Sequence, residues 1–407
     1  MKLYRGTPLL FIFCCGTVSA DVELGNRAVS CAEDAACFNR LHPDIPMAAR
    51  AMPGERIVMH GRDAADIDPD PAKLTVAESN PRQGPGVVHP LVGPVYIEGA
   101  KPGDVLAMTI EAIDPGPVGW TMASAFGFAG DAVGSESRFI VWRLNPRFAE
   151  SAALPGVRIP NASFPGVVTT LPGPKRLASI LDREQRLADA GGAVFLPDTG
   201  LAQPSTLCGE EGSRAGDCLR TIPPRENGGN MDIRYLGVGS TVYLPCDVEG
   251  CGLAIGDFHF AQGDGEASGT AIEMDADITV TTQIVRDGPD LGNGPHYEGP
   301  ASLLAIPSSR FYATTGYPLK SAGEVPPDIA YLAMAKAAGL SNLSKDLSLA
   351  AQNALVAMVD YIVGRYGYDR TQAYMIASVA VDLRIAQLVD VPNVGVTAVL
   401  PLDIFVK

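Results

Sequence analysis

Two short clusters of polar residues stand out in the chain, because each combines groups that bind metal ions or transfer protons. The first covers residues 225–232 (RENGGNMD), and the second covers residues 257–266 (DFHFAQGDGE). In an extended strand residues i and i+2 project from the same face, so Asp257 and His259 would lie side by side. A carboxylate beside an imidazole is a common ligand pair for a divalent cation. The second cluster therefore predicts a metal site.

The same spacing places Asn230 and Asp232 of the first cluster on one face, if that segment is also extended. After the second cluster's strand, Gly263 and Gly265 allow a tight turn, because glycine accepts backbone angles that other residues resist. This turn would bring Glu266 back beside the strand end. We therefore expect one site that draws on both clusters.

The chain resembles the acetamidase/formamidase family of metal-dependent amide hydrolases, and the two clusters carry the resemblance. GGNMDIR and GDFHFAQGDGEASGTAIE match the family, and further similar segments lie at 89–106, 224–229 and 378–405. The resemblance covers most of the chain. It implies hydrolysis of a small linear amide, such as formamide or acetamide, to a carboxylic acid and ammonia. It also implies an α+β fold, mostly β, with two β-rich lobes and a C-terminal helical layer.

An amide can be hydrolysed through a serine, a cysteine or a metal-bound water, and the sequence favours the metal. It contains no GxSxG motif, and every cysteine after residue 20 has a near partner with which it can form a disulfide. We expect Asp257 and His259 to bind a divalent ion, with zinc as the expected metal and Asp232 as the third ligand. Glu226 and Glu273 are the reserve ligands, although an ion pair for Glu226 and a solvent-facing strand position for Glu273 explain them better.

Amide hydrolysis also needs a proton on the leaving nitrogen, because the amide anion is a very poor leaving group. Glu266 is the residue that we expect to deliver it, and Glu98 in YIEGA is the second candidate. We expect Asn230, Gln262 and His42 to contact the substrate; the RLHPDIP segment around His42 resembles the entry segment of the longer formamidase-like members. A loop carboxylate for Glu98 and a loop histidine for His42 are the alternatives.

Three residues depart from the family's pattern. Phe258 and Phe260 flank the metal-site histidine where the family commonly has glycine and alanine, so we expect a narrower or differently shaped pocket. His89 stands where the family more often has asparagine, which weakens the case for a ligand role. Two other functions therefore stay open: an exported binding protein that has lost catalysis, and a hydrolase of a cyclic amide.

The composition indicates many short strands joined by turns, because 44 glycines and 33 prolines accompany 46% apolar residues among the 407. Residues 145–222 show no regular hydrophobic periodicity apart from a short helix, so we expect loops and irregular structure there, with 198–220 as an insertion. We treat 21–407 as one catalytic domain, β-rich at 40–325, helical at 326–390 and closing with a strand in 391–407. Periodicity predicts strands at 55–60, 104–113, 270–285 and 391–406, and helices at 178–189, 326–338, 344–366 and 370–388.

Residues 1–20 are typical of an export signal: Lys2 and Arg5 precede an apolar run too short to cross a bilayer, and cleavage is expected after Ala20. The mature protein would then be periplasmic or extracellular. An even number of cysteines in an exported chain favours disulfides. The six that remain after Ala20 form close pairs in the sequence, which predict the bridges Cys31–Cys37, Cys208–Cys218 and Cys246–Cys251.

The charge balance limits the partners that we expect. The formal net charge is −15, and such an acidic protein is repelled by nucleic acid and by anionic lipid, so neither is an expected partner. No stretch after the signal offers about eighteen uninterrupted apolar residues. No GxGxxG or GxxxxGK[ST] motif supports a nucleotide cofactor. We expect a homo-oligomer that acts on a small-molecule amide substrate.

Overall fold

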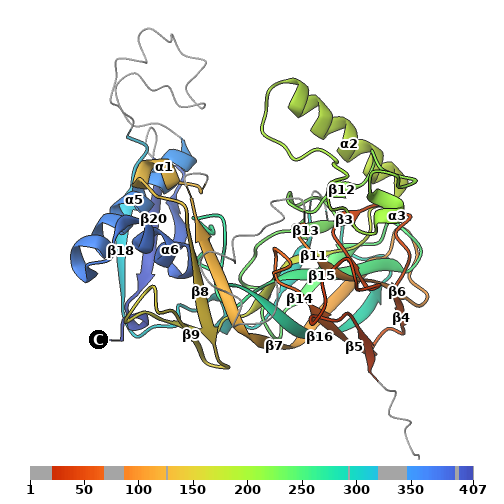
Figure 1. Ribbon diagram of the computed structural model, residues 1–407, viewed down its shortest axis with the longest axis horizontal. Helices are drawn as coiled ribbons and strands as arrows, with labels where there is room; N and C mark the ends of the chain where they lie inside the picture. Colours follow the sequence, from red (N-terminus) through yellow and green to blue (C-terminus); the bar gives the residue numbers. More distant parts are fainter. Residues whose placement is uncertain are drawn as a thin grey trace, which may run out of the picture.

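The computed structural model describes residues 21–67, 87–124, 127–291, 294–319, 346–389 and 394–406. The predicted export signal at 1–20 and the predicted helix at 326–338 lie outside these residues. The described part is built mostly from strands, with few helices, and it forms two lobes joined by long strands (Figure 1). The predicted α+β class with a majority of strand is confirmed.

The bounds of the described elements are as follows. The strands are β1 (Val22–Leu24), β2 (Cys37–Phe38), β3 (Arg40–Leu41), β4 (Ala49–Ala51), β5 (Arg56–Gly61), β6 (Leu91–Ile97), β7 (Val105–Ala123), β8 (Arg138–Leu144), β9 (Phe148–Glu150), β10 (Arg158–Pro160), β11 (Phe164–Thr169), β12 (Leu219–Arg220), β13 (Gly228–Asn230), β14 (Thr241–Pro245), β15 (Cys251–His259), β16 (Glu273–Val285), β17 (His296–Glu298), β18 (Phe311–Gly316), β19 (Asp382–Gln387) and β20 (Gly395–Pro401). The helices are α1 (Gly130–Val133), α2 (Pro174–Asp189), α3 (Ser205–Cys208), α5 (Leu347–Tyr366) and α6 (Arg370–Ala380), with 3₁₀ turns η2 (Ala301–Leu304) and η4 (Leu402–Ile404).

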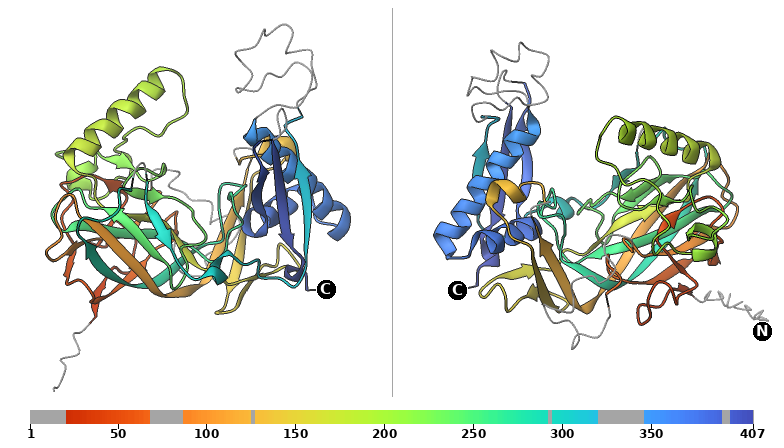
Figure 2. Two further views of the ribbon diagram at one scale, coloured as in Figure 1. Left: turned by 180° about the vertical axis from the view of Figure 1, so that it is seen from behind. Right: turned by 45° about the horizontal axis from the view of Figure 1, so that its top comes forward.

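One large sheet forms the body of the first lobe and continues toward the second (Figures 1 and 2). Its main strand order is β10-β9-β8-β7-β16-β15-β11-β13. The long strands β7 and β16 pair antiparallel from Val105 opposite Val285 to Trp120 opposite Glu273. Apolar residues of β16 in the predicted alternation, such as Ile278, are buried. β15 lies between neighbours on both sides, and every one of its residues is buried.

The second lobe is a three-stranded antiparallel sheet, β18-β20-β19, covered by α5 (Figure 2). Asp346 caps the start of α5 by accepting from the backbone N–H of Leu349 at 3.0 Å, and Gly367 ends it with a φ of 76°. Met358 and Ile362, from the predicted apolar stripe, are buried against this sheet. The stripe is therefore core, as predicted.

The helix α5 also meets the length and composition criteria for a membrane span, with a mean hydropathy of 1.4. The same criteria are met by core helices of soluble proteins. Its packing on β18, β20 and α6 is that of a core helix.

The helix predicted at 370–388 is too long. It ends at Ala380, and residues 382–387 form β19, which pairs with β20. Asp382 is buried there between Arg234 and Arg384, and this pairing overrides the helix propensity of the segment. The predicted helical part at 326–390 therefore contains both helix and strand.

A central strand lies inside the segment that we predict to be irregular. β11 pairs with β15 on one side and with β13 on the other. Pro165 and Gly166 conceal it in the sequence, because proline lacks an N–H donor and both residues are uncommon in strand interiors.

The three predicted disulfides are confirmed. Each predicted pair is bridged in the structure: Cys31–Cys37, Cys208–Cys218 and Cys246–Cys251. The second of them closes part of the 198–220 insertion, which is tied to the first lobe by the pairing of β12 with β3.

Candidate metal centre and active site

The candidate site is centred on the adjacent strands β11, β15 and β16. Asp257 and His259 lie two residues apart on β15, and their side chains join one cluster as predicted, although Asp257 has a φ of 57° and is not in regular extended backbone. In the strand register His259 is opposite Phe164 on β11 and opposite Glu273 on β16. The Phe164 ring meets the imidazole edge to face, with centroids 5.0 Å apart and planes at 89°. This contact fixes the orientation of the imidazole.

The first polar cluster reaches the same place across β11. Asn230 ends β13, and Asp232 follows it with a φ of 49°. A Cβ atom on Gly166 would lie 2.5 Å from Asp257 Oδ2 and 2.7 Å from Asp232 Oδ1. Only glycine at this position of β11 therefore lets the two carboxylates approach each other.

Glu266 lies on the turn after β15, and the second lobe holds this turn in place. Gly265 adopts a φ of 102°, which completes the predicted tight turn. The backbone N–H of Gly263 donates to the Ser378 carbonyl at 2.9 Å, and the N–H of Ser268 donates to Ser378 Oγ at 2.9 Å. Because Ser378 belongs to α6, the helical layer of the second lobe positions Glu266.

These side chains form two overlapping triads that share His259. Within each triad the ligand atoms lie within 4.8 Å of one another. His259 Nε2 is 3.1 Å from Glu273 Oε2 and 3.4 Å from Asp257 Oδ1. We call the members of both triads the acidic centre: Asp232, Asp257, His259, Glu266 and Glu273.

Burial shifts the proton affinities of the acidic centre. Burial first, and the Asp257 carboxylate second, raise the pKa of Asp232 to about 7. Burial also raises the pKa of Glu273 to about 7, against the opposing effect of His259. Burial and the neighbouring Asp232 raise the pKa of Glu266 well above its ordinary value.

The pKa values of the other two members, Asp257 and His259, shift in the direction that favours the charged form of each. Burial opposes the ionisation of Asp257, but the charges of His89 and His259 outweigh it and lower the pKa of this carboxyl. Burial opposes protonation of His259, but Glu273 and Asp257 raise its pKa well above the usual value. The centre thus places four carboxyl groups around one imidazole in a buried space.

A cavity of about 440 Å³ opens onto the acidic centre. Asn230, Asp232, Asp257, Glu266 and Glu273 line it. Four buried acceptor atoms in and beside the centre have no hydrogen-bond donor among the described residues: Asn230 Oδ1, Asp232 Oδ1, Gln262 Oε1 and Glu273 Oε2. Such groups are costly to bury unless something polar or charged occupies the space between them.

The acidic centre fits a divalent cation by its donors, burial and charge. Four carboxylates and one imidazole are the ligand types of zinc and similar ions. Within the described ranges, no lysine or arginine forms an ion pair with any of the five residues. A cation would supply the missing positive charge and bond to oxygen atoms that now lack partners.

Comparison with known proteins agrees with this site. The model of the Acetamidase/Formamidase family matches residues 26–407. This chain belongs to the acetamidase/formamidase family.

Its relatives in the family include both named activities. An acetamidase of Mycolicibacterium smegmatis is 32% identical over 371 residues, which cover 83% of this chain and 84% of the relative. A formamidase of Methylophilus methylotrophus is 30% identical over 396 residues, which cover 92% of this chain and 90% of the relative. A gamma lactamase structure from Delftia acidovorans is similar with a TM-score of 0.81 at 28% identity, and the match covers 94% of this chain and 93% of that chain. The chain is thus an amidohydrolase of the acetamidase/formamidase type.

Most of the residues predicted for the family's chemistry meet in the structure, since Asn230, Asp232, Asp257, His259 and Glu266 all lie at the site. The reserve ligand Glu273 belongs there as well, and its predicted solvent-facing position is wrong. Alternation places Glu273 on the face opposite to the buried Ile272 and Met274, which the pattern predicts to be the solvent face. At this end, however, β16 is buried on both faces.

Three predicted residues are not brought to the acidic centre. Glu98 follows the far end of β6 and pairs with Arg50 at 2.6 Å, which lowers its pKa. His42 is buried beside the 198–220 insertion, where its Nδ1 accepts from the N–H of Asp44 at 3.0 Å. Gln262 does not line the cavity; its Nε2 donates to the Asp232 carbonyl at 2.8 Å and so supports a ligand loop.

Glu226, the other reserve ligand, is engaged elsewhere. A hydrogen bond from Arg183 is the main cause that lowers the pKa of Glu226 to about 2. The predicted ion pair therefore forms, but with Arg183 of α2 rather than with a neighbour in sequence.

Phe258 and Phe260 do not narrow the pocket, contrary to the sequence-based expectation. Both are buried in the main core, and Phe258 packs against Gly61 of β5. His89, by contrast, lines the cavity with its Nε2 3.9 Å from Asp257 Oδ2. Sequence reasoning also missed Gly166, for which the proline before it was the available signal of an unusual strand.

Proposed function

We propose that the acidic centre binds a divalent cation, zinc by its donor set, and that the protein uses it to hydrolyse a small linear amide to a carboxylic acid and ammonia. The observation that supports this most strongly is the excess of buried carboxylates around His259, with unpaired acceptor atoms, at the wall of a cavity. The family supports amide hydrolysis, and the geometry supports the metal.

Asp257, His259 and Glu273, together with Asp232, would hold the cation. One imidazole with several carboxylates is a donor set that suits zinc. When bound, such an ion supplies a Lewis acid that polarises the amide carbonyl and lowers the pKa of a water molecule. Phe164 keeps the imidazole in its orientation, and Gly166 keeps the two aspartates close.

Glu266 moves the proton. Water adds its oxygen to the carbonyl carbon and the C–N bond breaks, so a proton must pass from water to the leaving nitrogen. Glu266 lines the cavity beside Asp232 and His259, so its carboxyl group can take this proton and pass it to the nitrogen. The products are the carboxylic acid and ammonia, which balance the amide and the water.

Asn230 orients the substrate. Its Oδ1 atom is buried, has no donor among the described residues and belongs to a residue that lines the cavity. This atom can accept a hydrogen bond from the NH₂ group of an amide. The acid product lacks that donor, so the contact favours the substrate over the product.

Ammonia release from formamide, acetamide and propionamide tests the proposal. We expect turnover by the purified protein, loss of turnover after a chelator strips the metal, and recovery when zinc returns. A metal-free protein that keeps its full rate would overturn the metal dependence. Absence of turnover on all three amides would overturn the small-amide activity.

Lactam hydrolysis is a second candidate function, because the overall fold resembles the gamma lactamase structure over nearly the whole chain. Ring opening of a lactam adds water across the C–N bond and releases no ammonia. Incubation with 2-pyrrolidinone separates the candidates: appearance of the ring-opened amino acid supports this second function, and an unchanged lactam contradicts it.

We also propose that the protein is exported and works outside the reducing cytoplasm. The three disulfides support this, because such bridges persist in oxidising compartments. Sequencing of the mature N-terminus should find Asp21 first. The homo-oligomeric state stays a prediction, which light scattering on the purified protein would test.

A further inference from the structure

The cavity has an apolar wall beside the acidic centre. Trp120 and Met122 of β7 line it together with Ala64, Ala65 and Ile222. Trp120 is the register partner of Glu273 across β7 and β16. Partners in adjacent strands project from the same face of the sheet, so the indole lies directly beside the carboxylate.

The indole is held rigidly in this position. Its Nε1 donates to Asp63 Oδ1 at 3.0 Å, and Asp63 itself accepts from the backbone of Ala65 and Ile67, each at 2.9 Å. Its ring stacks on Phe139, with centroids 5.4 Å apart and planes at 19°. Together with Ala64, Ala65 and Phe139, Trp120 forms an apolar cluster separate from the main core. The fold therefore maintains an apolar surface where a buried substrate would lie.

The size of the cavity exceeds what the smallest amides require. Its volume of about 440 Å³ falls in the range of roughly 300–1,000 Å³ that is typical of drug-sized ligands. Formamide has no carbon beyond its carbonyl, and acetamide has only a methyl group. A primary amide with a larger acyl group would therefore fill more of this cavity than either molecule does.

On the proposed amide hydrolysis, we infer that the preferred substrate is a primary amide with a branched or cyclic apolar acyl group, and that Trp120 determines this preference. The amide end meets the acidic centre and Asn230, and the acyl group packs on the Trp120 wall. Burial of an apolar group of this size on the wall strengthens binding by about tenfold or more. Isovaleramide can gain this binding, whereas acetamide has only a methyl group to bury.

Kinetics on matched substrates test the preference. We expect kcat/KM for isovaleramide to exceed that for acetamide by about tenfold or more, and Trp120→Ala to reduce this ratio by about tenfold. Trp142→Phe is the control, because Trp142 is buried, donates to Thr121 Oγ1 and does not line the cavity. It should keep the wild-type ratio. A wild-type protein that prefers acetamide, or a Trp120→Ala variant with an unchanged ratio, would overturn the inference.

A binding measurement remains decisive if Trp120→Ala does not fold. The chain has 2 tryptophans, so Trp142→Phe leaves Trp120 as the single fluorescent reporter. We expect a saturable change in its emission with isovalerate, at a concentration about tenfold lower than with acetate. Equal or absent responses would contradict the apolar site.

The two assays separate this inference from the proposed function. If the protein releases ammonia from acetamide and is no faster on isovaleramide, the proposed function stands and the inference about the acyl group is wrong. Saturable isovalerate binding without ammonia from any amide would support the apolar site and remove the proposed function.

Discussion

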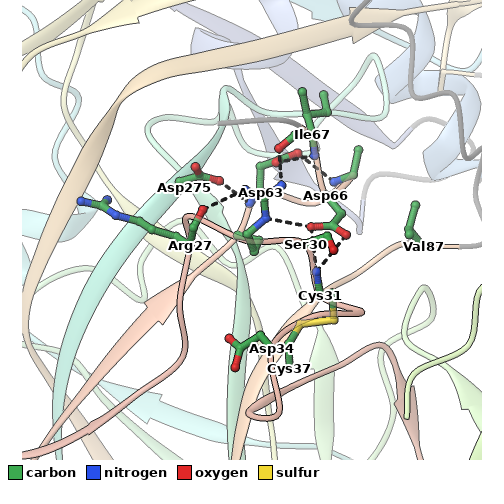
Figure 3. A network of polar contacts seen from close by, with 12 residues as sticks. Arg27, Ser30, Cys31, Asp34, Cys37, Asp63, Asp66, Ile67, Val87 and Asp275 are labelled. Carbon is green, nitrogen blue, oxygen red and sulfur yellow. Dashed lines mark hydrogen bonds and ion pairs between the residues drawn. A yellow bond between two sulfur atoms is a disulfide. The ribbon is translucent and has the colours of Figure 1, made fainter. Parts of the chain in front are cut away.

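Two acidic clusters each include one residue of β16, and these two residues are Glu273 and Asp275. The clusters differ in how their negative charge is compensated. Glu273 belongs to the acidic centre, and Asp275 belongs to a second cluster with Arg62, Asp63 and Asp66, which we call the arginine cluster. Figure 3 shows Asp63 and Asp66 in the arginine cluster, close to the Cys31–Cys37 disulfide. Burial raises the pKa of Asp275 and Glu273 alike, to about 7.

The arginine cluster supplies its own cation. Arg62 donates from Nε to Asp66 Oδ1 at 2.7 Å and from its terminal nitrogens to the carbonyls of Arg27 and Ile67. Both oxygens of Asp63 accept hydrogen bonds. Among the described residues no lysine or arginine pairs with the acidic centre, and the centre has acceptors without donors. Buried carboxylates that pair with an arginine have a structural role, whereas buried carboxylates without such a partner, at the wall of a cavity, indicate a bound ligand.

Loss of a metal ligand should have the largest effect on function. His259→Ala and Asp257→Asn should each lower metal content and reduce kcat/KM by more than the roughly 100-fold that loss of an outer-shell partner costs. Metal analysis and ammonia release on the same samples check this. Full metal occupancy in His259→Ala would mean that the cation is held elsewhere.

Glu266→Gln should separate chemistry from metal binding within the acidic centre. Glutamine keeps the size of the side chain but cannot carry the proton, so kcat should fall by about 100- to 10,000-fold while the metal stays bound. Unchanged kcat would remove Glu266 from the mechanism. Loss of the metal would instead identify Glu266 as a ligand.

Arg62→Met should show the opposite pattern, because it removes the cation of the arginine cluster. We expect the free energy of unfolding to fall by about 3–5 kcal/mol, since the buried aspartates lose their partner, with the metal retained. Arg50→Met is the matched control: Arg50 pairs with Glu98 at the surface, so this variant should lose much less stability than Arg62→Met. Equal losses in urea unfolding would contradict the distinction.

The smallest expected effect concerns the pH dependence of stability. Burial, with Asp63 second, raises the pKa of Asp275 to about 7, against about 3.9 in an unfolded chain. The folded protein therefore holds a proton between these values, and this residue's contribution to stability falls as the pH rises from about 4 to 7.

Asp275→Asn removes this dependence. Urea unfolding at pH 5 and pH 8 should show that the variant loses about 2 kcal/mol less than the wild type over this interval. Both proteins share the acidic centre, so the difference reports on Asp275 and its neighbour Asp63. Parallel pH profiles would show that Asp275 stays ionised throughout.

Local sequence rules predicted the parts of the fold and site that depend on local spacing. The two-residue spacing predicted that Asp257 and His259 share one site, and the glycine turn predicted that Glu266 lies beside the strand end. Cysteines close in the sequence predicted the disulfides. The apolar stripe of α5 was predicted in the same way.

Residues whose roles depend on register between distant strands were missed. Trp120 faces Glu273 only because β7 and β16 pair with that register, and Gly166 matters only because β11 runs beneath two aspartates. Glu98 and His42 were misplaced for the same reason, since nothing local shows that β6 carries Glu98 to Arg50. Pairing partners of this kind are set by the whole sheet.

Anomalous diffraction at the zinc absorption edge tests the central claim most directly. We predict a peak about 2.0–2.2 Å from a ring nitrogen of His259 and from carboxylate oxygens of Asp257 and Glu273 in crystals of active protein. The arginine cluster, two residues along β16, should show no peak. A peak at the arginine cluster, or none at either cluster in protein that releases ammonia from amides, would contradict the account.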